Sequence, residues 1–539
     1  MRKISFMLAA ALLLSCCFPA CADTVFDLGS SKYALSGQTA FVSISPEAVN
    51  TVKSGIFGAN TSYIGGGYGL YDEENRCFND ALLEKLTQSG VTHVRLPGGI
   101  EGDYFHWYEC VGPVESRLAQ INCFSSEYPT YTYKNGEPYD VLFGPDEWFE
   151  LCRRTGSALT LQLNAGNGTP QEAADFVRYC LDSGVEIESI TVGNEVCMAA
   201  EKVAGIRVTK SADEYIEFYE EVFRLLDDET KRELAERGIP FGCIGIPASH
   251  PLNRERSWDS AVLKALGDKT DFIDVHIAYS PYYVSGNRND EIIKCLLASS
   301  ELVRRHLKTE LTSIERFAPS VKIAICEHGP LGAIPYSAGM AGGLYLASFF
   351  QLILNEEKVI SADYLPLTNH PAANNLLGYY NELGQSVFFD NVVTHIFRMY
   401  SEQIGRSVLR TEISGAKTFS SVSVGLMSAV RNVPEADAAL YYDEEIGSGT
   451  LFLINKAYSE NTVFDVTLPF DDIRIDSVTE MFTPNNTMYN SYTRPELVKP
   501  IDHSAECAGD SEGHMICTLK PVSLLKIDFT TPNLRSQDS

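Results

Sequence analysis

The chain has 539 residues, of which 45% are hydrophobic, and it carries a net charge of −28 at pH 7. A chain of this length and composition can bury a large core, and more than one domain is expected. The strong negative charge disfavours nucleic acids, anionic membranes and polyanionic substrates as partners.

Residues 1–22 predict a signal peptide that is not part of the fold. A basic start is followed by an apolar run over residues 4–14, which is too short to span a bilayer, and small residues then permit cleavage before Asp23. A competing interpretation takes Leu-Leu-Ser-Cys16 as a lipobox, with a lipid anchor on Cys16. Both predict a secreted or periplasmic protein. No later run is apolar for long enough to predict a transmembrane segment.

Residues 51–405 alternate short apolar runs with longer amphipathic segments, of which 212–237 and 291–317 are the longest. This alternation is typical of βα units around a parallel sheet. The apolar runs cover residues 54–60, 91–99, 158–166, 187–195, 240–249, 271–280, 321–329 and 359–368. Eight runs predict one (β/α)₈ TIM barrel. An open doubly wound sheet is the alternative, but no GxGxxG or P-loop glycine pattern follows any run.

The remaining segments lack helical periodicity. Residues 406–530 contain strand-like runs separated by turn residues, including one at 422–430, and predict an all-β sandwich. Residues 23–50 read as strands without a barrel partner, so we expect them to join this sandwich. Residues 531–539 are polar and predict a disordered tail.

Two predicted barrel strands end in glutamates. The fourth run ends in Asn194-Glu195, and the seventh ends in Glu327. The carboxyl ends of barrel strands converge on one face, where TIM-barrel enzymes carry their chemistry. A carboxylic acid and a carboxylate facing each other are the groups that glycoside hydrolysis needs. The competing interpretation is that each glutamate forms a salt bridge at the barrel rim.

Other strand ends carry polar and aromatic residues that could contact a sugar. Asn164 follows the third strand, and Trp107 and Tyr279 could stack on sugar faces. His276 is expected either to contact the nucleophile or to hydrogen-bond within the core. Arg95 is expected either to orient a carboxylate or to bind substrate.

Metals and cofactors are not expected. His106, His276 and His328 show no HExxH or similar spacing, and the cysteines show no paired CxxC pattern.

Several motifs resemble the family 51 glycoside hydrolases, mostly retaining α-L-arabinofuranosidases on (β/α)₈ barrels. They are Arg95-Leu-Pro-Gly-Gly with Tyr-Phe-His-Trp107, Leu163-Asn-Ala-Gly-Asn-Gly-Thr-Pro-Gln-Glu-Ala-Ala-Asp-Phe-Val-Arg-Tyr-Cys180, and Val192-Gly-Asn-Glu195. The resemblance implies Glu195 as general acid/base and Glu327 as nucleophile. It further implies Asn194 as a substrate contact, with His276 and Tyr279 supporting the nucleophile. Family members often form oligomers, so a homo-oligomer stays open.

The chain departs from the family pattern near the sugar pocket. The run ending the first strand, Gly58-Ala-Asn-Thr-Ser-Tyr63, lacks the family's glutamate, and Glu327 is followed by His328 where the family has tryptophan. The catalytic frame therefore looks intact, while the sugar pocket looks altered.

The leading hypothesis is a secreted retaining glycosidase that releases α-L-arabinofuranosyl residues from plant-type polysaccharides. Alternatives keep the mechanism on a β-xyloside, β-glucuronide or β-glucoside, or make the barrel a non-catalytic carbohydrate-binding protein. A surface-anchored adhesion protein that uses the β-domain is a further alternative.

Overall fold

The computed structural model describes residues 24–29, 37–121, 137–198, 202–203, 206–279, 286–330, 332, 334–368, 374–382, 385–425, 427–507, 510–531 and 533–534. The predicted signal peptide and the cysteine of the lipobox, Cys16, lie outside these residues.

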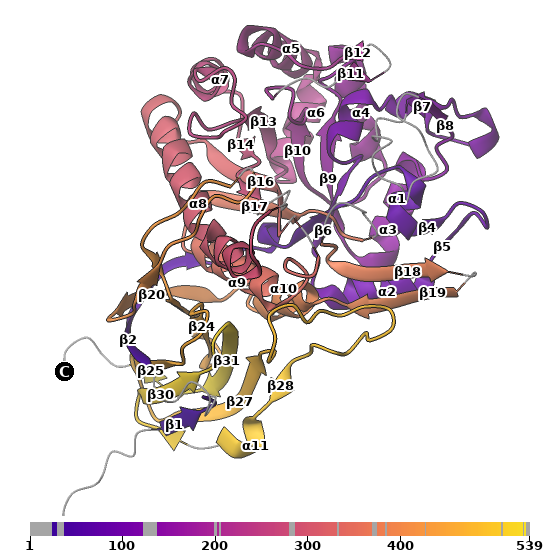
Figure 1. Cartoon of the computed structure of the whole chain (residues 1–539). Helices are drawn as coiled ribbons and strands as arrows, with labels where there is room; N and C mark the ends of the chain where they lie inside the picture. Colours follow the sequence, from indigo (N-terminus) through magenta and orange to yellow (C-terminus); the bar gives the residue numbers. More distant parts are fainter. Residues whose placement is uncertain are drawn as a thin grey trace, which may run out of the picture.

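Eight parallel strands close into a barrel (Figure 1). Neighbours pair in the order β14, β13, β10, β9, β6, β3, β17, β16, and β16 pairs back with β14. The strands are β3 (Gly58–Asn60), β6 (His93–Leu96), β9 (Ala158–Leu163), β10 (Ile187–Val192), β13 (Phe241–Gly245), β14 (Phe272–Val275), β16 (Lys322–Gly329) and β17 (Val359–Tyr364). Each predicted run contains one of these strands, which confirms the predicted fold class. The short β15 (Ala278–Tyr279) extends the sheet beside β16.

Helices surround the barrel strands (Figure 1). They are α2 (Asp80–Ser89), α3 (Pro145–Thr155), α4 (Pro170–Asp182), α5 (Ala212–Leu225), α6 (Asp228–Glu236), α7 (Trp258–Leu266), α8 (Asn289–Phe317), α9 (Met340–Leu354) and α10 (Val392–Ser401). The segment 212–237 was predicted as one helical stretch but forms both α5 and α6. Asp227 separates them because its side chain accepts a hydrogen bond from the Thr230 N–H at 2.7 Å and caps α6.

A second, β-rich domain contains one 11-stranded sheet. Its strands are β1 (Thr24–Asp27), β2 (Gln38–Thr51), β20 (Ser407–Ser414), β23 (Ala436–Asp443), β24 (Ser448–Asn455), β25 (Thr462–Thr467), β27 (Ile473–Met481), β28 (Ile501–Asp502), β29 (Asp510–Ser511), β30 (His514–Leu519) and β31 (Ser523–Thr530). The N-terminal strand β2 lies between β25 and β20. Along its described residues, the chain therefore passes through this sheet, builds the barrel and returns to the sheet.

One strand predicted for the β-rich domain is absent from its described part, and one short strand lies in the predicted tail. Residues 422–430 do not form a strand in their described part, because Val424 and Met427 pair across a tight turn and the Ser421 and Ser423 hydroxyls accept the Val430 and Ala429 N–H groups. Asn533–Leu534, within the predicted disordered tail, form β32 and pair with β26 (Phe470–Asp471).

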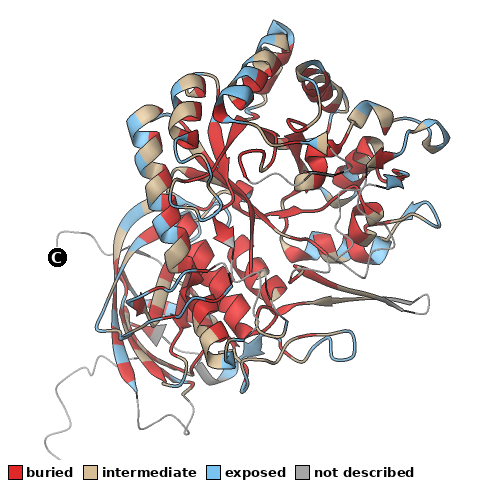
Figure 2. Cartoon of the chain, turned by 45° about the horizontal axis from the view of Figure 1, so that its top comes forward, coloured by how far each residue is buried: buried red, intermediate tan, exposed pale blue. Residues whose placement is uncertain are grey.

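Barrel and sheet share a buried interface formed by α9 and α10. Every residue of α9 is buried, and Figure 2 shows the buried residues concentrated on the barrel strands and on the helices facing the sheet. The Tyr400 ring of α10 stacks on Phe452 of β24 with 4.3 Å between centroids. This aromatic contact joins the two domains through one apolar layer.

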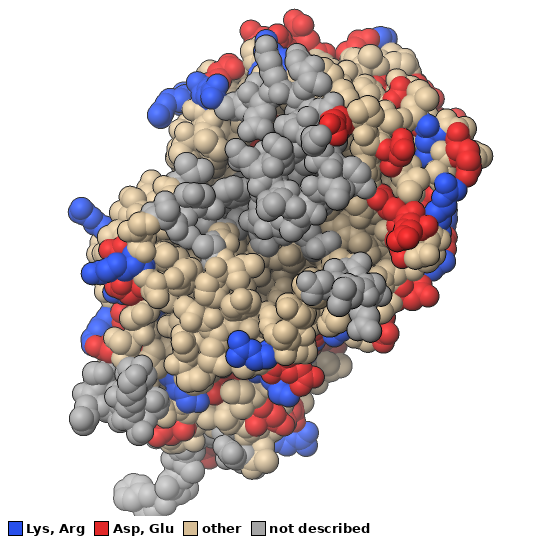
Figure 3. Space-filling view, turned by 45° about the vertical axis from the view of Figure 1, so that its right-hand side comes forward, with Lys and Arg blue, Asp and Glu red and all other residues tan. Residues whose placement is uncertain are grey.

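The surface carries mixed charge. On the face in Figure 3, acidic and basic side chains are interspersed around the margin, so the described part of that face offers no continuous basic patch. None of the helices among the described residues combines the length and apolarity needed to cross a bilayer.

Candidate active site

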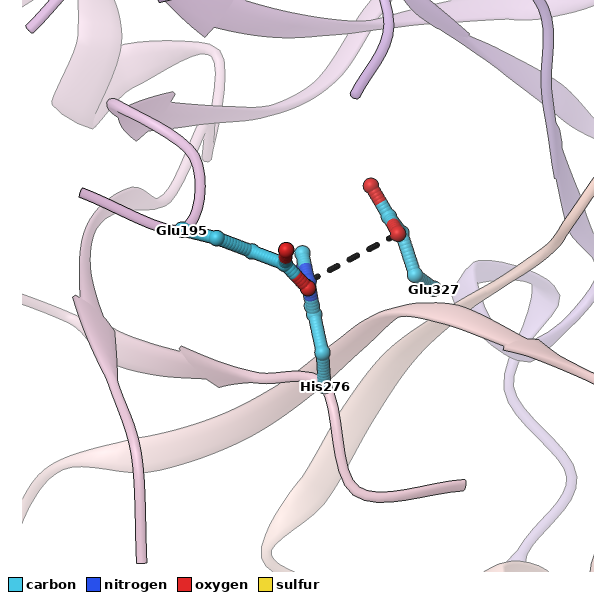
Figure 4. Close-up of side chains that lie close together, drawn as sticks. All are labelled: Glu195, His276 and Glu327. Atoms are coloured by element: carbon cyan, nitrogen blue, oxygen red, sulfur yellow. Dashed lines mark hydrogen bonds and ion pairs between the residues drawn. The ribbon is translucent and has the colours of Figure 1, made fainter. Parts of the chain in front are cut away.

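The two predicted glutamates lie at the same mouth of the barrel and point toward each other (Figure 4). Beyond β10 the chain turns at Gly193, whose φ is 88°, and then presents Asn194 and Glu195. A side chain at this position would be strained, and its Cβ would lie only 2.8 Å from the Ala165 Cβ. Glu327 lies near the carboxyl end of β16. Tertiary structure therefore brings together two residues that are distant in sequence.

His276, directly after β14, lies between the two carboxylates. Its Nδ1 lies 2.9 Å from Glu195 Oε1 and 3.7 Å from Glu327 Oε2. One carboxylate oxygen of each glutamate and a ring nitrogen of His276 all lie within 4.8 Å of one another. The carboxyl groups are thus close enough to act on the same bond.

Arg95 of β6 holds the base of the site. Its side chain is fully buried, and Nη1 donates to Glu327 Oε1 at 2.9 Å and to Asn60 Oδ1 at 2.8 Å. Nη2 donates to Asn194 Oδ1 at 2.8 Å. Burial opposes the charge of Arg95, but the negative charges of Glu327 and Asp274 raise its pKa above the usual value. Because both Nη groups bind these side chains in a buried place, the contacts favour a positioning role of Arg95 toward Glu327 and Asn194.

The surroundings of His276 favour its protonated form. Burial alone would lower its pKa, but Glu327 and Asp274 raise it well above the usual value. Its Nε2 lies 3.5 Å from Asp274 Oδ2. Burial would raise the Asp274 pKa, but the charge and hydrogen bond of His276, together with Arg95 and the Cys326 N–H, lower it below the usual value. Sequence reasoning missed Asp274, although an acidic residue within the apolar strand β14 was a usable signal.

Two more carboxyl groups border the site, from the 3₁₀-helix Ile100–Tyr104. Glu101 and Asp103 are buried, and burial raises the pKa of each to about 7. Asp103 Oδ1 accepts a hydrogen bond from the Asn194 N–H at 3.3 Å. Their position just after a strand end was visible in the sequence, but nothing there assigned them a partner.

The described contacts of Trp107 and Asn164 connect them to neighbouring loops and α4. Trp107 stacks on Phe176 with 5.0 Å between centroids, and its Nε1 donates to the Glu172 carbonyl at 2.9 Å. Asn164 Oδ1 accepts from the N–H groups of Gly166, Asn167 and Gly168 at 3.0, 3.2 and 3.1 Å, and so organises the turn after β9. None of these contacts reaches the glutamates. The Tyr279 side chain lies outside the described part of the chain.

The same site could also be considered for a metal ion, because one possible ligand atom from each of Glu195, His276 and Glu327 lies within 4.8 Å of the others. However, Arg95 already places a cation against Glu327, and a metal would have to displace any proton on His276 Nδ1. The other histidines weighed as ligands have separate environments: His106 pairs with Glu172 at 3.0 Å, and His328 packs at a tilt against Phe349 with 4.4 Å between centroids. The charges therefore favour carboxylate chemistry over metal binding.

Comparisons with known proteins show what the chain is similar to. Residues 85–201 match the family model for the alpha-L-arabinofuranosidase 1 domain. The probable alpha-L-arabinofuranosidase C of Aspergillus niger is 32% identical over 147 residues, which are 26% of this chain and only 27% of that protein. An intracellular exo-alpha-L-arabinofuranosidase of Bacteroides ovatus is 20% identical over 461 residues, 78% of this chain and 80% of that protein.

Among solved structures, the GH51 alpha-L-arabinofuranosidase of Thermotoga petrophila superimposes with a TM-score of 0.73 at 20% identity, covering 91% of this chain and 100% of that one. This likeness concerns the fold. The chain is α-L-arabinofuranosidase-like and has the fold of the family 51 glycoside hydrolases.

Proposed function

We propose that the protein is a glycoside hydrolase that cleaves α-L-arabinofuranosidic bonds with retention of configuration. The observation that carries the proposal is the approach of Glu195 and Glu327, whose nearest paired oxygens lie within 4.8 Å. Retaining enzymes place their carboxyl groups about 5–5.5 Å apart, whereas inverting enzymes need about 6.5–9.5 Å to admit a water molecule. The arabinofuranoside substrate is inferred from the names of the related proteins.

The two glutamates differ in environment, and this difference supports the roles proposed for them. The Glu327 side chain is 7% exposed and held by Arg95, which stabilises a negative charge suited to attack on the anomeric carbon. The Glu195 side chain is 32% exposed. It can therefore protonate the departing oxygen and later accept a proton from the water that releases the sugar.

The first test compares Glu327→Gln with wild type on p-nitrophenyl α-L-arabinofuranoside. We expect hydrolysis to fall to the assay background, because the amide cannot form the covalent intermediate. Glu221→Gln, at a half-exposed site on α5, should retain wild-type activity. Undiminished turnover by Glu327→Gln would defeat the assignment. Hydrolysis of aryl β-xyloside, β-glucuronide or β-glucoside, but not arabinofuranoside, would retain the mechanism and change the sugar.

A second variant tests the proposed role of Glu195 as general acid/base. Glu195→Ala should lose about 10²–10⁴-fold in turnover. Added azide should then restore release of a good leaving group and yield a glycosyl azide of retained configuration, identified by NMR. An azide product of inverted configuration would instead identify Glu195 as the nucleophile.

We also propose that the protein is exported, on the strength of the N-terminal sequence alone. Mass analysis of the mature protein from its native host should find a chain beginning at Asp23, or at a lipidated Cys16. A chain that retains residues 1–22 would contradict export, and would match the intracellular location in the name of the Bacteroides ovatus protein.

A further inference from the structure

Glu101 is a buried carboxyl group in the active site that the proposed mechanism does not use. It is as buried as Glu327, with 5% of each residue exposed. Three other buried carboxylates of the barrel each face a cation: Glu327 faces Arg95, Asp274 faces His276, and Asp363 faces His93. Throughout the described residues, no lysine, arginine or histidine forms an ion pair with Glu101. A desolvated carboxyl without a cation is costly. Glu310 shares this environment and hydrogen-bonds to Asp259, whereas Glu101 is set apart by its place beside Glu327.

Gly99 shows where the Glu101 carboxyl lies. A Cβ added to Gly99 would lie 2.8 Å from Glu101 Oε2 and 3.8 Å from Glu327 Oε1. The two carboxyl groups therefore border the same small space, which remains open because residue 99 has no side chain. The Gly99 φ of 45° also favours glycine at this position.

The Glu101 carboxyl is held in place from its other side. The Tyr68 hydroxyl, from α1 (Gly65–Gly69), donates to Glu101 Oε1 at 3.0 Å. Burial raises the pKa of Glu101 to about 7, although the Tyr68 hydrogen bond opposes the increase. Tyr68 thus anchors one oxygen, while the other faces the space beside the nucleophile.

We propose that Glu101 is a substrate-binding and specificity-determining residue, whose carboxyl accepts hydrogen bonds from hydroxyl groups of the sugar attacked by Glu327. This inference rests on the proposed glycosidase function. A carboxylate can accept bonds from two neighbouring hydroxyls, and such bonds are stronger than those between neutral groups. Sugar hydroxyls replace the water that burial removes, so Glu101 recovers hydrogen bonds when substrate binds. A substrate lacking the matching hydroxyl leaves the carboxyl unsatisfied and is rejected.

The test combines Glu101→Gln with a set of aryl α-L-arabinofuranosides that each lack one ring or side-chain hydroxyl. On the complete sugar, Glu101→Gln should lower kcat/KM by about 10- to 150-fold, the range for one charged hydrogen bond. Wild type should lose at least about 10-fold on one deoxy sugar. On that same sugar the variant should lose almost nothing more, because the bond has already been removed.

Two further variants separate substrate contact from a structural effect. Tyr68→Phe keeps the ring and should lower kcat/KM by about 2- to 12-fold, with the largest effect on the same hydroxyl. Glu310→Gln removes a carboxyl that is equally deeply buried, on α8, and should leave kcat/KM unchanged. Thermal melting of each variant checks folding.

The inference is overturned if Glu101→Gln keeps kcat/KM within about twofold of wild type, or lowers it equally on every deoxy sugar. The proposed function has a separate test. If wild type neither hydrolyses an aryl arabinofuranoside nor is covalently labelled at Glu327 by a mechanism-based inhibitor, the proposed function is overturned, and this inference with it. If wild type hydrolyses the arabinofuranoside and is labelled at Glu327, but Glu101→Gln leaves kcat/KM unchanged, only the inference about Glu101 is overturned.

Discussion

His276 lies beside both glutamates of the candidate site. Glu195, Glu327 and Asp274 all lie within 3.7 Å of one of its ring nitrogens. These carboxylates raise the pKa of His276 and favour its cationic form, although the ring is buried. In turn, a cation here stabilises the ionised forms of Asp274 and Glu327.

His276→Gln should therefore move the acid limb of the pH profile of kcat/KM to higher pH. Removing a positive charge makes the carboxyl of the proposed nucleophile Glu327 harder to ionise, so it needs a higher pH to lose its proton. Steady-state rates across the pH range provide the measurement. His306→Gln is the control, because burial lowers the pKa of His306 to about 4 and that ring is neutral at working pH. An unchanged acid limb would mean that His276 carries no charge at working pH.

At the scale of the element, the shortest barrel strand shows how neighbouring strands constrain each other. β3 pairs with β6 on one side and β17 on the other. A buried ion pair crosses it, with His93 Nε2 of β6 lying 2.7 Å from Asp363 Oδ1 of β17. A Cβ at Gly58 would overlap both of these atoms. Glycine is therefore required where the ion pair crosses β3.

Gly58→Ala should destabilise the fold by about 1–3 kcal/mol, because the methyl group overpacks a rigid core. Denaturant unfolding measures the change in the free energy of unfolding. The comparison is Gly37→Ala, where the nearest atom to an added Cβ is the Asn461 carbonyl oxygen at 3.9 Å. Equal stability of the two variants would show that the ion pair can move aside without cost.

At the scale of the whole molecule, the barrel and the β-rich domain share one interior. Gln351 of α9 donates to the Tyr400 hydroxyl at 3.0 Å, and the Tyr400 ring packs on Phe452. Ser348 of α9 donates to Asp437 of β23 at 2.8 Å, and the buried Lys456 pairs with the same carboxylate at 2.8 Å. These contacts predict that the domains unfold together.

Phe452→Ala should lower the free energy of unfolding by about 3–5 kcal/mol, because a fully buried ring is removed. Loss of activity and loss of β-sheet signal should still coincide on heating, since the interface couples both domains. Phe41→Ala, on an exposed face of β2, should change stability by no more than about 0.5 kcal/mol. Activity that survives after the sheet has melted would show that the barrel is independent of the β-rich domain.

The sequence by itself determined the order of the βα units and the two strand-end glutamates. Both follow from local patterns: apolar runs of strand length, helical periodicity between them, and polar residues where the runs end. The break between α5 and α6 and the turn at residues 422–430 escaped prediction, because side chains of Asp227, Ser421 and Ser423 capture backbone N–H groups there.

Only the tertiary structure decided what each polar side chain does. Arg95 bridges three strand ends, Trp107 stacks on Phe176, and Glu101 lies beside Glu327 across Gly99. The partners of Arg95 and Trp107 lie far away in the sequence, and even Glu101 meets Glu327 only after the barrel closes. The physical reason is that hydrogen bonding and desolvation depend on non-local packing, whereas the periodicity of strands and helices is set by residues that are close in the sequence.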